Sequence, residues 1–170
     1  MLPIYLYGHP VLRTPCQAVS IEEDWQNIQA FIAQMWETMY AAGGVGLAAN
    51  QVGKSWRIFV VDASVFLQEE VKEELVQKYK KTFINPVLVK EEGEMGFFEE
   101  GCLSVPGVYD QIERKSKILV SYWDENKIFH ENEALEGTLA RVFQHEYDHI
   151  EGKFFFDLLS PTRKSFLEKK

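Results

Sequence analysis

Apolar residues recur at helical spacing in two long stretches of the chain. In residues 24–40 they come every three or four positions, at Ile28, Phe31, Ile32, Met35 and Met39. This pattern predicts a helix that Ser20 or Asp24 caps and that ends at Gly43 and Gly44. Residues 135–151 predict a second helix with two adjacent faces, one holding Thr138, Val142, His145 and His149, the next holding Leu139, Phe143, Glu146 and Ile150. So broad an apolar surface indicates a central helix covered by sheets.

Shorter segments predict β-strands around that helix. Residues 57–61 are largely apolar, as in a buried strand. Residues 82–89 predict another strand, and Asn85-Pro86 inside it favours a position near a sheet edge or at a bulge. Residues 116–123 and 127–131 flank a polar turn segment, which predicts a hairpin. We therefore expect a single α+β domain over residues 1–170, with antiparallel or mixed β-sheets packed around the central helix.

A charged segment interrupts the predicted strands. Residues 69–81 contain eight charged side chains, with Val71, Leu75 and Tyr79 spaced four apart. This spacing predicts an exposed amphipathic helix within an insertion at about residues 64–81. Its expected role is solvated surface, and a docking or dimer element is the alternative.

The predicted central helix carries a metal-hydrolase motif, H-E-x-x-H, at residues 145–149. Residues four apart on a helix lie on the same face, so His145 and His149 can bind one metal ion from one side. Glu146 lies beside them and can handle a proton on a metal-bound water. Two helix histidines without a metal are the alternative reading of the motif alone.

The motif leaves a third ligand to be found, because a catalytic metal usually takes three protein ligands and a water. Downstream of the helix there is no histidine, and Glu151 and Asp157 are possible oxygen ligands close to the helix end. His9, His130 and Cys16 stand in ordinary surroundings and are expected to be structural or surface residues. Cys102 lies between a glycine and a proline, where the chain leaves regular structure, and is the better third ligand.

Three segments together point to a known family. Residues 44–53 read GVGLAANQVG, residues 100–104 read EGCLS, and residues 144–149 read QHEYDH. In this order and spacing they resemble the three signature motifs of the peptide deformylase family. The likeness extends over residues 9–160, which is nearly the whole chain.

The resemblance implies a peptide deformylase fold and removal of the N-formyl group from the initiator methionine of nascent polypeptides, with release of formate. It implies a metal site of Cys102, His145 and His149, natively Fe²⁺, with Zn²⁺, Ni²⁺ or Co²⁺ as substitutes. Metal-bound hydroxide then attacks the formyl carbonyl, with Glu146 as general acid and base. The oxyanion donors implied are the Gln51 side-chain amide and the Leu103 backbone N–H.

The substrate pocket follows from the same likeness. Gly44 and Gly46 lack a Cβ and allow the backbone to approach a small formyl group. The methionine side chain is expected in an apolar pocket with walls that include Val45, Phe98 and Val142. Asp148 is assigned a hydrogen-bonding role beside the site, whereas Glu100 and Arg114 either pair with each other or touch the substrate backbone.

Composition limits the partners and the cellular compartment that are expected for this chain. Net charge is −8, which argues against broad nucleic-acid affinity. Two distant cysteines offer no disulfide framework, so a reducing interior is expected. The sequence shows no signal-peptide pattern and no apolar run of the roughly 20 residues that span a bilayer. We expect a cytoplasmic monomer, and a weak, salt-dependent ribosome contact through the basic tail at residues 160–170, since some family members dock through a basic C-terminal helix.

Two other functions compete with deformylation. An H-E-x-x-H metallopeptidase that cuts internal peptide bonds is disfavoured by the missing downstream ligand and by the segment around Cys102. A non-enzymatic protein with a closed structural metal needs neither Glu146 nor Gln51.

Overall fold

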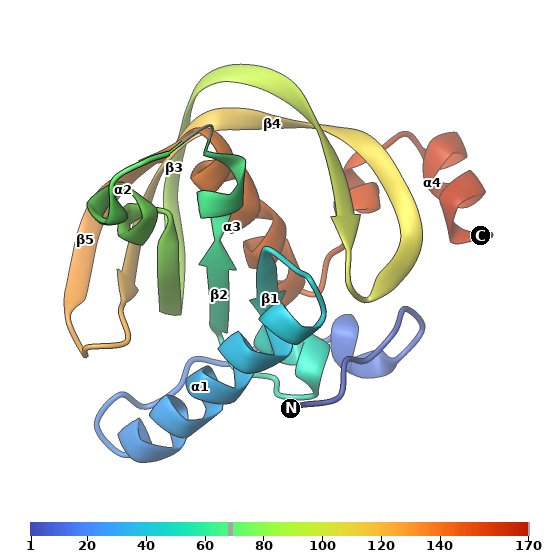
Figure 1. Cartoon of the computed structure of the whole chain (residues 1–170). Helices are drawn as coiled ribbons and strands as arrows, with labels where there is room; N and C mark the ends of the chain where they lie inside the picture. The colour runs from blue at the N-terminus through green and yellow to red at the C-terminus, as the bar shows by residue number, and fades with distance from the viewer. Residues whose placement is uncertain (68–69, 170) are drawn as a thin grey trace.

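The computed structural model describes residues 1–67 and 70–169 (Figure 1). Its strands are β1 (Gly46–Ala48), β2 (Ile58–Asp62), β3 (Lys80–Cys102), β4 (Val105–Trp123) and β5 (Phe129–Glu136). Its α-helices are α1 (Trp25–Ala41), α2 (Glu73–Lys78), α3 (Gly137–Ile150) and α4 (Pro161–Glu168). Short 3₁₀ helices are η1 (Pro10–Leu12), η2 (Ala49–Val52), η3 (Ala63–Phe66) and η4 (Phe155–Leu158). The molecule is α+β, as the sequence predicts.

The five strands form one antiparallel sheet in the order β1-β2-β3-β4-β5. β3 and β4 are far longer than the predicted segments and arch over α3 as a long ribbon (Figure 1). The register shifts between Ile84 and Val87, so Asn85-Pro86 marks a bulge. The alternative prediction, a position near the sheet edge, is wrong, because β3 is the central strand of the sheet. Asn85 takes a φ of 50° there, and its side chain bonds both backbone groups of Val19, which stabilises the bulge.

Helices cover both faces of the sheet at β2, where every residue is buried. Phe59 and Val61 share a core cluster with α3, whereas Ile58 and Val60 share one with α1, as alternation along a strand requires. On the α3 side, the Phe143 ring lies 5.1 Å from that of Phe59 and 4.8 Å from that of Phe83. The buried face of α3 is therefore fixed by aromatic packing against the sheet.

The two predicted helices are confirmed with small changes at their ends. α1 starts at Trp25, but the Asp24 side chain makes no capping hydrogen bond, and Ser20 Oγ accepts from the N–H of Glu23 ahead of the helix. α3 starts at Gly137, since Leu135 pairs with Ile118 in the sheet.

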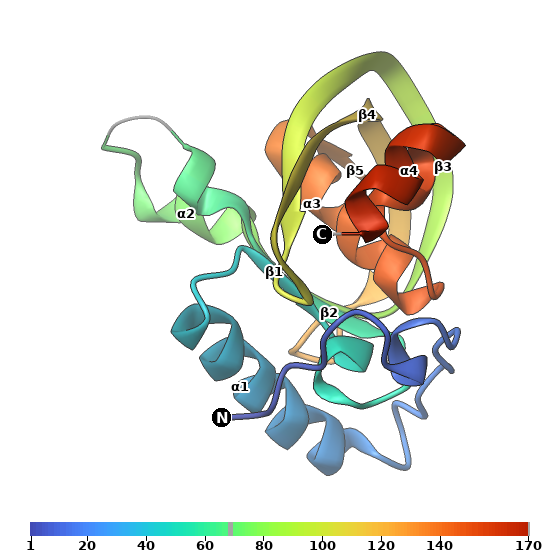
Figure 2. The same ribbon diagram turned by 90° about the vertical axis from the view of Figure 1, so that its right-hand side faces the viewer.

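The charged insertion is only partly helical. α2 covers Glu73–Lys78, residues 80–81 belong to β3, and Glu69 of the predicted segment lies outside the described residues. Both views place α2 at the outer edge of the molecule (Figures 1 and 2). No helix among residues 1–67 and 70–169 is both long and apolar enough to cross a membrane.

Candidate active site

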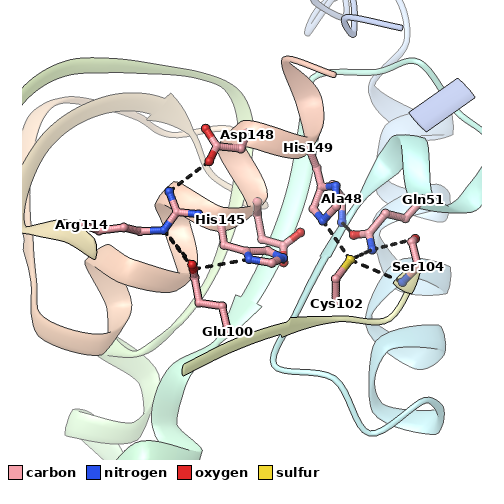
Figure 3. Close-up of polar contacts among 10 residues, drawn as sticks. Ala48, Gln51, Glu100, Cys102, Ser104, Arg114, His145, Asp148 and His149 are labelled. Atoms are coloured by element: carbon pink, nitrogen blue, oxygen red, sulfur yellow. Dashed lines mark hydrogen bonds and ion pairs between the residues drawn. The ribbon is translucent and has the colours of Figure 1, made fainter. Parts of the chain in front are cut away.

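Three potential metal ligands meet where α3 passes beneath the end of β3. Helical spacing puts His145 and His149 on one face of α3, and the last residue of β3 is Cys102. The Cys102 sulfur and one nitrogen of each imidazole all lie within 4.8 Å of one another, and Cys102 Sγ is 3.1 Å from His149 Nε2 (Figure 3). One thiolate and two imidazoles are a donor set that suits Zn²⁺ and Fe²⁺.

The surroundings of this cluster also fit a cation. His149 Nδ1 and Glu146 Oε2 are buried and have no hydrogen-bond partner among the described residues. Burial holds the pKa of His149 well below its usual value, so its imidazole is neutral and able to bind a metal. Two donors face the Cys102 sulfur, the Ser104 backbone N–H at 3.4 Å and the Gln51 amide at 3.5 Å.

A buried ionic network orients His145 from behind. Glu100 Oε1 lies 3.4 Å from His145 Nδ1, and the Arg114 guanidinium donates to both oxygens of Glu100, at 2.9 and 3.1 Å (Figure 3). Arg114 also donates to Asp148 Oδ2 at 3.0 Å. Burial alone would raise the pKa of Glu100, but His145 and Arg114 bring it below its usual value. A carboxylate on the outer nitrogen of a metal-binding histidine is a recurrent device for fixing its ring.

Glu146 lies at the same end, with Oε1 3.9 Å from His145 Nε2. Its side chain is buried, and this desolvation raises its pKa to about 7 despite the opposing charge of His145. A methyl group on Gly46 would stand 2.6 Å from Glu146 Oε1. Gly46 is therefore required for the carboxylate to lie against β1, a reason different from the close approach to substrate expected from the sequence.

The Gln51 side chain is held in one orientation within η2. The Ala48 N–H donates to Gln51 Oε1 at 2.9 Å, and Gln51 Nε2 donates to Ser104 Oγ at 3.1 Å. The amide N–H groups consequently face the Cys102 side of the cluster (Figure 3). Leu103 follows Cys102 directly, and its side chain packs so closely on Gly44 that a Cβ there would be 2.6 Å from Leu103 Cδ1.

A cavity of about 700 Å³ opens from this cluster. Nearly all of the sequence-predicted site residues line it: Gly44, Val45, Gly46, Gln51, Phe98, Cys102, Leu103, Val142, His145 and Glu146. Its wall also includes Phe66, Tyr109 and Arg141, which the sequence did not single out, and Glu100. The structure favours the pairing role for Glu100 and Arg114, because their side chains form a buried ion pair. In the β3–β4 ribbon Glu100 stands opposite Asp110 and Arg114 opposite Gly96, so the two side chains reach toward each other along the ribbon.

For one of these residues, Glu100, the sequence alone indicates a place beside the site. Glu100 stands two positions before Cys102 on a strand, so alternation puts both side chains on one face. No sequence pattern indicates the position of Phe66, since that position depends on how the insertion folds back on β3.

The remaining candidates have other partners. Glu151 pairs with Arg57 and Asp157 with Arg13, so neither acts as an oxygen ligand here. His9 caps η1, His130 pairs with Asp124, and Cys16 is buried with its pKa raised to about 12 by desolvation.

Comparison with known proteins identifies the family. The sequence profile described as Polypeptide deformylase matches residues 1–165. The chain belongs to the peptide deformylase family. It is 48% identical to "Peptide deformylase" of Flavobacterium psychrophilum over 174 residues, which is 100% of this chain and 88% of that protein. It is 45% identical to the protein of the same name from Cytophaga hutchinsonii, over 99% of this chain and 87% of the relative.

Solved structures of peptide deformylases share the fold. The enzyme from Thermus thermophilus superposes with a TM-score of 0.83 at 39% identity, covering 99% of this chain and 92% of that one. The enzyme from Synechococcus elongatus, solved in complex with actinonin, gives a TM-score of 0.82 at 36% identity over 99% of this chain and 84% of that one. Since the peptide deformylase family is metal-dependent, the cluster of Cys102, His145 and His149 is the natural candidate for the metal centre.

Proposed function

We propose that this chain is a metal-dependent hydrolase that removes the N-formyl group from the initiator formyl-methionine of nascent polypeptides and releases formate. The observation that carries this proposal is the meeting of one cysteine, two histidines and a buried glutamate at one cavity, in a chain matched along residues 1–165 by the deformylase profile. The comparisons give no support to a metallopeptidase that cuts internal bonds. We further propose that residues 1–170 work as one catalytic domain.

Cys102, His145 and His149 would hold one divalent ion, natively Fe²⁺, with Zn²⁺, Ni²⁺ or Co²⁺ able to substitute. When bound, such an ion acts as a Lewis acid and lowers the pKa of a coordinated water. The compact arrangement of one sulfur and two nitrogens supports this assignment, as does the Glu100 carboxylate behind His145.

Glu146 is proposed as the general acid and base. Its buried carboxylate lies beside the candidate ligand His145, where it can accept a proton during attack and return it to the leaving nitrogen. The Gln51 amide and the Leu103 backbone N–H would donate to the oxyanion that develops on the formyl oxygen. Gly44, Val45, Gly46, Phe98 and Val142 would receive the methionine side chain, because they line the same cavity.

The test is formate release from formyl-Met-Ala-Ser by anaerobically iron-loaded enzyme. We expect Glu146→Gln to lower kcat by about 10²–10⁴-fold, since a positioned proton carrier is lost, while metal content is kept. Glu151→Gln is the matched control, because that carboxylate pairs with Arg57 at the end of the same helix and should leave turnover unchanged. Digestion of casein without formate release would refute the proposal.

We also propose a cellular setting for the reaction. We place a monomeric enzyme in the cytoplasm, where formylated chains are made. A ribosome contact through residues 160–170 would be salt-dependent, yet Arg163 already pairs with Asp110 and Lys164 with Asp157. Unchanged co-sedimentation with ribosomes after deletion of residues 161–170 would exclude the tail as a docking element.

A further inference from the structure

The cavity extends beyond the metal end to a wall made by three separate elements. η3 contributes Phe66, β3 contributes Phe98, and α3 contributes Arg141. The rings of Phe66 and Phe98 meet edge to face, with centroids 5.5 Å apart and planes at 85°. The Arg141 guanidinium lies 5.6 Å from the Phe98 centroid on the same wall. This outer wall is thus aromatic, whereas the inner end is polar.

Phe66 is held in place by the turn that opens the charged insertion. Asp62 caps η3 by accepting from the Ser64 N–H at 3.0 Å, and Tyr40 donates its hydroxyl to the other oxygen of Asp62 at 2.7 Å. The Ala63 N–H donates to the Tyr79 carbonyl at 2.8 Å, which ties both ends of the insertion together. The ring is therefore presented by a fixed turn, and the insertion is not only solvated surface.

Comparison with the neighbouring residue of η3 shows that Phe66 in particular is directed into the cavity. Val65 is 63% exposed and does not line the cavity. Phe66 is 36% exposed, covered on one side by Phe98 and open toward the cavity on the other. A large apolar ring with a free face inside a cavity is a surface suited to an apolar ligand.

The charge on this wall is directed away from the ligand. Arg141 donates to the carbonyls of Gly96 and Ile112, so its guanidinium is committed to holding the β3–β4 ribbon. The rings of Phe66 and Phe98 and the aliphatic side chains of Val45 and Val142 give this cavity an apolar surface for the ligand. Aliphatic walls accept any straight apolar side chain, whereas aromatic rings make an additional favourable contact with a thioether sulfur.

We propose that Phe66 is a specificity-determining residue that, together with Phe98, contacts the thioether of the substrate's methionine. This inference rests on the proposed deformylase function and adds to it a side chain from the insertion. Phe66 is not among the groups assigned to the metal, the proton transfer or the oxyanion, so its contact should be equal in the ground state and the transition state. Its loss should therefore appear in KM rather than in kcat.

The experiment compares formyl-Met-Ala-Ser with formyl-norleucine-Ala-Ser, in which a methylene replaces the sulfur. Variants are Phe66→Leu, which keeps apolar bulk without the ring, and Phe66→Ala, with Val65→Ala as the matched control. We expect the ratio of kcat/KM for the two peptides to fall about two- to tenfold in Phe66→Leu relative to the unaltered enzyme. KM should rise in Phe66→Ala with kcat within about twofold, and Val65→Ala should behave as the unaltered enzyme.

A binding measurement keeps the inference testable without turnover. Calorimetry on the Glu146→Gln enzyme would give Kd for Met-Ala-Ser and norleucine-Ala-Ser, with and without Phe66→Leu. A fall in the methionine preference supports the contact, and an unchanged preference overturns it. A change in Kd on Phe66→Leu that depends on the residue after methionine, and not on methionine itself, would also overturn it. If methionine preference is present but the unaltered enzyme releases no formate, the proposed function fails and the contact stands.

Discussion

The two ends of the cavity are built on different principles. At the inner end, buried charged side chains form a network: Arg114 bonds Glu100, which faces His145. At the outer end, Phe66 and Phe98 are held by packing and remain partly open to solvent. A buried ionic network has few alternative arrangements, because each lost partner leaves a charge without compensation. Rings that pack by contact can be exchanged at lower cost.

This difference separates the properties that each end should control. Orientation of metal ligands and of a proton carrier requires fixed atoms, which the network supplies. Recognition of a flexible thioether requires area and shape, which the rings supply. Substitutions at the inner end should therefore change stability, metal content and kcat, and those at the outer end should change KM.

The strongest way to break the inner end is Arg114→Met. The Arg114 side chain is only 4% exposed, and its loss leaves the buried Glu100 carboxylate without its guanidinium partner. We expect a loss of about 3–5 kcal/mol in the free energy of unfolding, measured by urea denaturation. Metal affinity should fall about ten- to a hundredfold, since His145 loses its oriented partner.

Arg57→Met is the control, because Arg57 forms a similar pair with the more exposed Glu151. Its cost should be about 1 kcal/mol or less. Equal losses of unfolding free energy in the two variants would show that the buried network contributes no more to stability than the exposed pair. Adding Glu100→Gln to Arg114→Met should recover part of the stability by removing the stranded charge.

The next effect concerns the Gln51 amide. Gln51→Ala removes a donor that faces the cysteine sulfur and Ser104 but leaves the three candidate ligands in place. We expect kcat to fall by about 10²–10³-fold with unchanged metal content, measured by formate release and metal analysis. A metal-depleted variant would instead assign Gln51 to the support of Cys102. Asn50 is not a suitable control, since its side chain is bonded to the backbone of His149.

The inner end could be foreseen in the sequence to a greater degree than the outer end. His145, Glu146 and His149 follow from helix periodicity within a single turn, which is a local property. Cys102 was reached by eliminating other ligands, and its proximity to the histidines arises from a contact between β3 and α3. Gln51 and Leu103 were reachable only through family resemblance.

The fold shows the same division between local and distant causes. Strand β2, parts of β3, β4 and β5, and the two long helices were predicted from the sequence pattern, and the α+β class is confirmed. The short core strand β1 was not predicted. The great length of β3 and β4 was not, because their outer halves alternate weakly and carry charges such as Glu91 and Glu94. The position of Phe66 depends on the turn at Asp62 and on backbone pairing with Tyr79, a distant residue that no local pattern reveals.

A smaller change tests how closely the inner end is packed. Gly46→Ala would place a methyl 2.6 Å from Glu146 Oε1, and a buried carboxylate has little room to move. We expect kcat to fall about a hundredfold, as for a catalytic group displaced by roughly 1 Å. Gly96→Ala adds the same methyl 2.8 Å from the end of the flexible Arg141 side chain and should cost less. Equal activity in both variants would contradict a tightly fixed Glu146.

The smallest expected effect is the acid response of an ion pair outside both ends. Burial alone would raise the pKa of Asp157, but bonds from Arg13, Lys164 and the Phe154 N–H lower it to about 2, from an ordinary value of 3.8. A depressed folded-state pKa contributes stability that is complete above about pH 4 and is lost as the pH falls toward 2. The stability difference between the unaltered chain and Asp157→Asn should follow this course in urea titrations. Its size should be about 1 kcal/mol or less, because Arg13 is 40% exposed and water screens the pair. A difference that does not depend on pH would mean that Asp157 acts through its neutral hydrogen bonds, in contrast to the charged pairing that holds the inner end.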